Sequence, residues 1–322
     1  MSPYPYYSHN HLSFGEIKMI LEYIKAIFLG IIEGITEWLP ISSTGHIILF
    51  DEFFPLTVGA NVHPDFVAEF MSMFEVVIQL GAIMAVVVLF WGKLWPFSKK
   101  KSTNEKKAVW QTWFKVCVAS VPAAAVGILL DKIIEKATGK DIDGWLYNGT
   151  VVALMLIIYG VLFIFIEKAN KNRVPSVNSI GDITYKQALL LGGFQALAII
   201  PGTSRSGSTI LGSMLVGFSR PCGAEFSFFM GIPAMVGGSL IKALGFLQFV
   251  GGENSAGVPL DVPTDAWIIL VLASLIAFAV SMVAIKFLMS FVKKHSFTPF
   301  GVYRIVLGVV VLLVFAIFGR LA

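Results

Sequence analysis

An apolar stretch that is interrupted in its middle lies at residues 33–46, which read EGITEWLPISSTGH. Glu33 and Glu37 are four residues apart, so they lie on one face of a helix. Pro40 disfavours helical backbone at the residue before it, which predicts that this helix ends at Leu39. Two carboxylates are therefore predicted one turn apart, directly before a sharp break in the chain.

A second helix is predicted to begin directly after the proline. Ser42 or Ser43 is a suitable N-cap for it, because a serine hydroxyl accepts a hydrogen bond from the first free backbone N–H groups. Ser43 and His46 are three residues apart and share one face of the new turn. Thr44 adds a further hydroxyl. The sequence predicts a helix, a turn rich in hydroxyls and a new helix.

The same pattern returns 161 positions later, at residues 195–209, which read QALAIIPGTSRSGST. Pro201 takes the place of Pro40, and a turn rich in hydroxyls and glycine again precedes a predicted helix. Helix N-termini carry unpaired N–H donors and the positive end of the helix dipole, which suits anions. The polar side chains that we expect at this turn are Ser204, Arg205, Ser206 and Thr209.

The composition of the 322 residues places both stretches in a membrane protein. Charged residues make up 14% and hydrophobic residues 56%, whereas a soluble domain carries about 25% charged residues. The 24 basic and 20 acidic side chains leave a net charge of only +4. This composition excludes a soluble enzyme, a disordered tail and a nucleic-acid binder, so the lipid bilayer is the expected partner.

Six stretches are long and apolar enough to cross about 30 Å of hydrocarbon. They are Phe66–Trp91, Trp110–Leu130, Tyr147–Ile166, Glu225–Phe249, Ala266–Ile285 and Tyr303–Gly319. The connections at 93–115, 168–186 and 286–295 are rich in lysine and arginine, which predicts that they are cytoplasmic. The spans alternate correctly only if residues 187–218 enter and leave on the same side, as a re-entrant hairpin.

The order of these segments predicts an all-α fold built from an internal repeat. Each half is a broken hairpin followed by three spans, and because three is odd the second half must be inverted relative to the first. The predicted organisation is an N-terminal extension (1–17), a first repeat (18–166), a cytoplasmic linker (167–186) and a second, inverted repeat (187–322).

If the two turns face each other, they form a site for a phosphate group. The Arg205 guanidinium and the surrounding hydroxyl and N–H donors match phosphate oxygens. Glu33 and Glu37 would repel such an anion unless a divalent cation lies between them, which predicts Mg²⁺ or Ca²⁺ at this pair. Ser42, Thr44 and Ser206 are further candidates for binding the phosphate.

Together, residues 33–46 and 201–209 resemble the bacterial undecaprenyl-diphosphate phosphatase family, also called bacitracin-resistance proteins. The resemblance extends from about residue 18 over nearly the whole chain. It implies hydrolysis of undecaprenyl diphosphate to the monophosphate and phosphate, which recycles the lipid carrier of peptidoglycan synthesis. It also implies a multi-pass protein of the bacterial cell (inner) membrane whose active site faces the outer side. A homodimer is an assembly that the sequence leaves open.

The resemblance also implies roles for single residues. Glu33 and Glu37 match the acidic pair of the family, and Ser43 and His46 match its serine–histidine pair. The second phosphate-contacting motif is matched by Ser204, Arg205 and Thr209.

From the chemistry of these groups we expect Ser43 to attack phosphorus, with His46 accepting its proton and later activating water. Attack by His46 itself, or directly by water, remains open. A transporter or flippase of polyprenyl phosphates is the alternative function.

Overall fold

The computed structural model describes residues 14–58, 64–139, 146–252, 254 and 257–318. Most of these residues are helical, and within them the chain forms no strand beyond one isolated bridge between Val177 and Phe218. The elements are α1 (Phe14–Thr36), α2 (Ser43–Phe53), α3 (Pro64–Leu89), α4 (Trp91–Leu94), α5 (Thr103–Thr138), α7 (Gly149–Ala169), η1 (Ile180–Asp182), α8 (Tyr185–Ala196), η2 (Leu197–Ile199), α9 (Arg205–Leu215), α10 (Arg220–Val250), α11 (Thr264–Phe291) and α12 (Thr298–Ile317).

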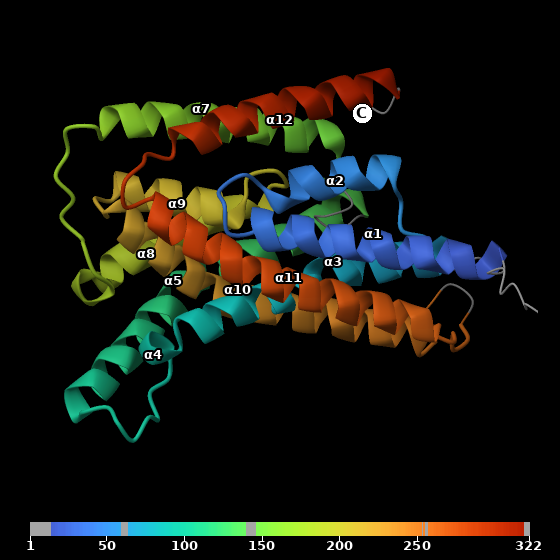
Figure 1. The fold of residues 1–322 in the computed structure, drawn as a ribbon, viewed down its shortest axis with the longest axis horizontal. Helices are drawn as coiled ribbons and strands as arrows, with labels where there is room; N and C mark the ends of the chain where they lie inside the picture. The colour runs from blue at the N-terminus through green and yellow to red at the C-terminus, as the bar shows by residue number, and fades with distance from the viewer. Residues whose placement is uncertain (1–13, 59–63, 140–145, 253, 255–256, 319–322) are drawn as a thin grey trace, which may run out of the picture.

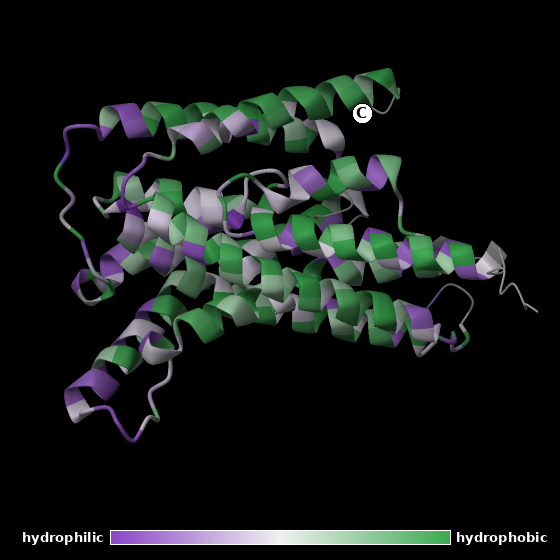
Figure 2. Cartoon of the chain, in the orientation of Figure 1, coloured by the Kyte–Doolittle hydropathy of each residue, from purple (hydrophilic) through white to green (hydrophobic). Residues whose placement is uncertain are grey.

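Six helices of the described chain, α3, α5, α7, α10, α11 and α12, are long and apolar enough to cross a membrane, which confirms the six predicted spans. Hydrophobic residues dominate the long helices, and hydrophilic residues gather in the loops and at helix ends (Figure 2). α5 begins seven residues before the predicted Trp110, because the Ser102 hydroxyl and the Glu105 carboxylate form a reciprocal capping box. Gly139, in the left-handed conformation, ends it.

The long helices pack in pairs that join the two halves of the chain. α7 lies along α12, α1 along α11, and α3 contacts both α10 and α11, while α5 packs on α8 (Figure 1). α7 and α12 approach closely at Gly160 and Gly301, where an added Cβ would lie 2.7 Å and 2.8 Å from the facing carbonyl oxygen. Such small residues let membrane helices touch through their backbones.

Both interrupted stretches form a helix, a turn and a second helix, as predicted. The regular part of α1 ends at Thr36, and turn hydrogen bonds, such as that from Leu39 N–H to Ile35 O, continue to Leu39. α2, α8 and α9 have only 11 or 12 residues, whereas a full crossing needs about 20. α1 begins at Phe14, inside the predicted extension; residues 1–13 of that extension lie outside the described residues.

Candidate active site

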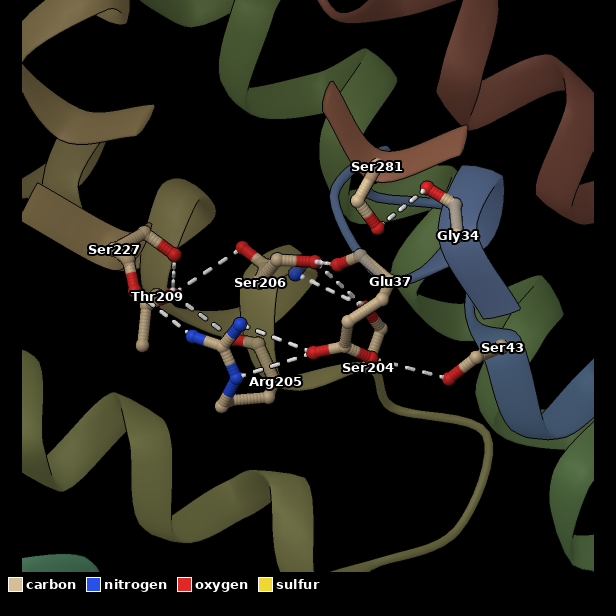
Figure 3. A network of polar contacts seen from close by, with 10 residues as sticks. Gly34, Glu37, Ser43, Ser204, Arg205, Ser206, Thr209, Ser227 and Ser281 are labelled. Atoms are coloured by element: carbon tan, nitrogen blue, oxygen red, sulfur yellow. Dashed lines mark hydrogen bonds and ion pairs between the residues drawn. The ribbon is translucent and has the colours of Figure 1, made fainter. Parts of the chain in front are cut away.

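The turns of the two hairpins meet in the interior of the bundle, and an ion pair joins them (Figure 3). Arg205, the first residue of α9, donates through Nη2 and Nε to Glu37 Oε1 at 3.0 Å and 3.3 Å. The two side chains are only 12% and 9% exposed, so this is a nearly desolvated pair. The sequence prediction that the guanidinium and the carboxylates share one site is consistent with this geometry.

Three further contacts fix the guanidinium. Its Nη1 donates to the Ser227 carbonyl at 2.8 Å, and its carbon lies 5.9 Å from the Trp38 ring centre. A Cβ on Gly231 would lie 2.8 Å from the guanidinium, so glycine is needed at this point of α10. The charge is therefore held in one place before any ligand arrives, as an anion site requires.

Ser43 contacts the opposite side of the same carboxylate. Its Oγ donates to Glu37 Oε2 at 3.2 Å, so one carboxylate contacts both the predicted nucleophile and the predicted phosphate-binding cation. Ser43 is also the first residue of α2 and lies at the N-terminal end of its helix dipole.

The hydroxyls of the second turn fix its backbone, and one of them, Ser206, binds the first turn. Ser204 is the N-cap of α9 and accepts from Gly207 N–H at 3.1 Å. Ser206 donates to the Glu37 carbonyl at 2.9 Å. Thr209 donates to the Arg205 carbonyl at 2.9 Å and lies 2.5 Å from the Ser227 hydroxyl. In this arrangement Ser206 and Thr209 position the site.

His46 is oriented by two partners other than Ser43. Its Nδ1 lies 2.7 Å from the Ser42 carbonyl, and its Nε2 lies 2.7 Å from the Tyr303 hydroxyl, with the two rings stacked at 10°. A carbonyl only accepts, so Nδ1 donates, and in the neutral imidazole Nε2 accepts from Tyr303. Within the described contacts no hydrogen bond joins Ser43 to His46, and the group at the serine hydroxyl is Glu37.

Arg304 on α12 was not singled out as a site residue, yet it links the two turns. It is fully buried, and its guanidinium donates to the carbonyls of Pro40 at 3.3 Å, Gly202 at 2.7 Å and Thr203 at 2.9 Å. The available signal was its charge inside an apolar stretch, since intramembrane charges are costly and usually have a role.

Ser42 combines backbone strain with an unsatisfied hydroxyl. Its φ is 73°, a conformation that favours glycine, and its buried Oγ has no hydrogen-bond partner among the described atoms. Ser204 has a φ of 69° at the matching place in the second turn. Such strain collects at functional sites. Thr44, the second residue of α2, lines two cavities beside the turns.

Glu33 lies one turn before Glu37, and both of its carboxylate oxygens are buried without a hydrogen-bond partner among the described atoms. Glu37 and Glu75 are its acidic neighbours, and Arg205 is the nearby cation. A buried carboxylate without a partner is costly, and an oxygen-seeking divalent cation would satisfy it, so the residues fit the predicted ion. The described part of the chain holds no cluster of three or more metal-ligating side chains, so substrate oxygens would have to complete the ligand set.

Two adjoining cavities lead to the turns. One of about 880 Å³ is lined by Thr44 and Pro201 and reaches Asp131 and Phe249 near the ends of α5 and α10. The other, of about 610 Å³, is lined by Ser43 and Thr44. Thr44, Ser72, Val76, Gln79, Tyr147 and Lys242 line both.

Fold and site together define a multi-pass membrane protein whose paired helix–turn–helix hairpins bring together helix N-termini, hydroxyls and a fixed guanidinium, with Ser43, Thr44 and Pro201 lining the adjoining cavities. Residues 26–310 match the family model described as bacitracin resistance protein BacA. The chain belongs to this BacA family. It is 52% identical to an undecaprenyl-diphosphatase of Enterococcus faecalis over 89% of this chain and 95% of that protein. An undecaprenyl-diphosphatase of Acetivibrio thermocellus is 49% identical over 92% and 98%.

Proposed function

We propose that the protein is an integral membrane phosphatase that hydrolyses undecaprenyl diphosphate to undecaprenyl phosphate and phosphate. Its product is the lipid carrier of peptidoglycan synthesis, and its activity confers bacitracin resistance. The observation that carries the proposal is the chain of contacts from Ser43 through Glu37 to Arg205. These contacts support roles for Ser43 as nucleophile, Glu37 as proton acceptor and Arg205 as phosphate-binding cation, near the N-termini of α2 and α9.

In the proposed reaction, Arg205 and the N–H and O–H donors of the second turn bind the terminal phosphate. The Ser43 oxygen attacks its phosphorus while its proton passes to Glu37, the group to which it is hydrogen-bonded. The bond from phosphorus to the bridging oxygen breaks, and undecaprenyl monophosphate leaves. Water then hydrolyses the phosphoserine and releases phosphate. Transfer of the proton to His46 is the alternative, and it requires His46 to leave Tyr303.

A divalent cation, Mg²⁺ or Ca²⁺, is proposed as the cofactor, and Glu33 and Glu37 would hold it. When bound it would neutralise phosphate oxygens of the substrate. The unpartnered oxygens of Glu33 support this assignment. We expect EDTA to abolish phosphate release and added Mg²⁺ or Ca²⁺ to restore it, and full activity in EDTA would refute the cofactor.

We also propose that the hairpins are re-entrant and that the two halves form an inverted repeat. The shortness of α2, α8 and α9 supports re-entry, because none of them can cross alone. The packing supports the repeat, in which α1 corresponds to α8, α3 to α10 and α5 to α11. The contact of α1 with α11 then corresponds to that of α8 with α5, and the contact of α3 with α11 corresponds to that of α10 with α5. All four pairs are in contact.

The proposed location is the bacterial inner membrane, with the site open to the outer side. The larger cavity reaches Asp131 and Phe249. They lie near the connections 131–144, which is balanced to acidic, and 251–265, which contains acids and no base, so both are expected on the outer side. The diphosphate would enter there, while its prenyl chain stays in the lipid. We propose a homodimer as the assembly. No nucleic-acid partner is expected.

The test is release of inorganic phosphate from undecaprenyl diphosphate by purified protein in detergent. We expect wild type to release phosphate, and Ser43→Ala and Arg205→Ala to lose at least two orders of magnitude in kcat/KM, since one preorganised charge partner is worth about 3 kcal/mol. A transporter of polyprenyl phosphates would release none. Near-normal turnover by Arg205→Ala would refute the site.

A further inference from the structure

Lys242 is a charged side chain on the membrane-spanning α10 that the proposed reaction leaves unused. It is half-buried and lines both cavities, one of which also contains Ser43. Its Nζ donates to the Ser72 hydroxyl on α3 at 3.1 Å, so the ammonium lies between these two helices, facing the cavity. Charges at membrane depth are costly and generally have a role in substrate handling.

The position of Lys242 along α10 sets which part of a substrate it can reach. Gly231 lies beside the Arg205 guanidinium, and Lys242 follows eleven residues later, about 16 Å along the helix axis. Side chains of a helix point toward its N-terminus, so the ammonium leans back toward the turns. Eleven residues make about three helical turns, so Lys242 lies on the same face of α10 as Gly231. A headgroup whose terminal phosphate is bound at Arg205 can extend its second phosphate, the one that carries the lipid, along this face toward Lys242.

The charges around the cavities indicate that a cation is needed there for a diphosphate to bind. Their lining contains three carboxylates, Glu69, Glu75 and Asp131, and among the described lining residues Lys242 is the single base. A diphosphate entering this space meets net negative charge. A lysine ammonium is a compact cation with three donors, suited to a phosphate oxygen.

We infer that Lys242 is a substrate-positioning residue that binds the lipid-linked phosphate while Arg205 binds the terminal one. The inference rests on the proposed function and adds to it a second phosphate subsite. Recognition of two phosphates by two cations, Arg205 at the second turn and Lys242 in the cavity lining, selects a diphosphate lipid over free phosphate. It also predicts that Lys242 contributes to binding of the lipid monophosphate product, whereas free phosphate depends on the turns alone.

The experiment compares Lys242→Met, which keeps the apolar stem, with Lys242→Arg and with a matched control, Lys93→Met. Lys93 is paired with Glu225 near the opposite end of α10, so this control removes an equal charge far from the cavities. We expect Lys242→Met to raise KM about tenfold, or about 1.4 kcal/mol, with kcat within about threefold. We expect Lys242→Arg and the control to stay near wild type.

Product binding separates a phosphate contact from a structural role. Calorimetric titration of the detergent-solubilised protein with undecaprenyl monophosphate should show about tenfold weaker binding for Lys242→Met, while inhibition by inorganic phosphate stays unchanged. Unchanged binding of the lipid, equal weakening of both ligands, or the same loss in the Lys93 control overturns the inference. The titration needs no turnover, so if wild type released no phosphate the proposed reaction would fail while Lys242 was still tested.

Discussion

Replacing Glu37 by glutamine should uncouple the two hairpin turns. The carboxylate accepts two hydrogen bonds from Arg205 and one from Ser43, in a setting where it is 9% exposed. Breaking a buried ion pair costs about 4 kcal/mol, and the glutamine oxygen keeps a hydrogen bond to the charged guanidinium worth about 2 kcal/mol. We therefore expect Glu37→Gln to lower the free energy of unfolding by about 2 kcal/mol.

The effect on turnover should be far larger than the loss of stability. Glutamine cannot take a proton from Ser43, and a positioned proton acceptor contributes about 10²- to 10⁴-fold to rate. Phosphate release from undecaprenyl diphosphate gives kcat, and thermal unfolding in the same detergent gives stability. Measuring kcat well below the unfolding temperature keeps the folded fraction near one, so a fall in kcat reports the chemistry.

Two companion variants decide whether the reasoning holds. Glu225→Gln removes a carboxylate that is 12% exposed and paired with Lys93 at 2.6 Å, so it matches the charge change away from the site and should leave kcat unaltered. His46→Gln tests the other proton acceptor. If Glu37→Gln kept more than a tenth of wild-type kcat while His46→Gln abolished turnover, the assignment of the proton to Glu37 would be wrong.

Two further changes test the architecture of the turns. Arg304→Met should cost about 3 kcal/mol and nearly all activity, because the carbonyls of Pro40, Gly202 and Thr203 lose their donor; a thermal unfolding midpoint equal to wild type would contradict this. Ser42→Gly should instead stabilise the protein by about 1 kcal/mol, since glycine accepts φ 73° and the change removes a buried hydroxyl without a partner among the described atoms. The same change should lower kcat/KM for the diphosphate. A variant with normal activity would show that this hydroxyl binds no phosphate.

The fold followed from the sequence because its signals are local and strong. Six apolar runs could only be spans, and Pro40 and Pro201 each force a break that the neighbouring hydroxyls cap. Span ends were less predictable, because polar capping residues such as Ser102 and Glu105 extend α5 beyond its apolar part. Hydropathy alone predicts the length of the apolar part of a helix, not the length of the whole helix.

The sequence allows candidate site residues to be named, but it does not predict the contacts between them. Charges and hydroxyls beside a break are visible in the sequence, so Glu37, Ser43 and Arg205 could be named. The role of Arg304 depends on backbone carbonyl oxygens more than 100 positions away. Every residue has such a carbonyl, so the sequence does not show which ones Arg304 will bind. The orientation of His46 depends likewise on Tyr303, 257 positions later.

The two turns carry complementary chemistry at corresponding positions, and this explains why both are needed. When the turns are aligned on their N-cap serines, Ser42 and Ser204, Glu37 corresponds to Ile199 and Ser43 to Arg205. The first turn thus supplies the carboxylate and the second the guanidinium, and their ion pair can form only between the halves. Neither hairpin alone could hold a phosphate beside a nucleophile, because the acid would repel the anion and the cation would lack a proton acceptor. Divergence of the two halves is therefore what turns a pair of similar hairpins into one asymmetric site.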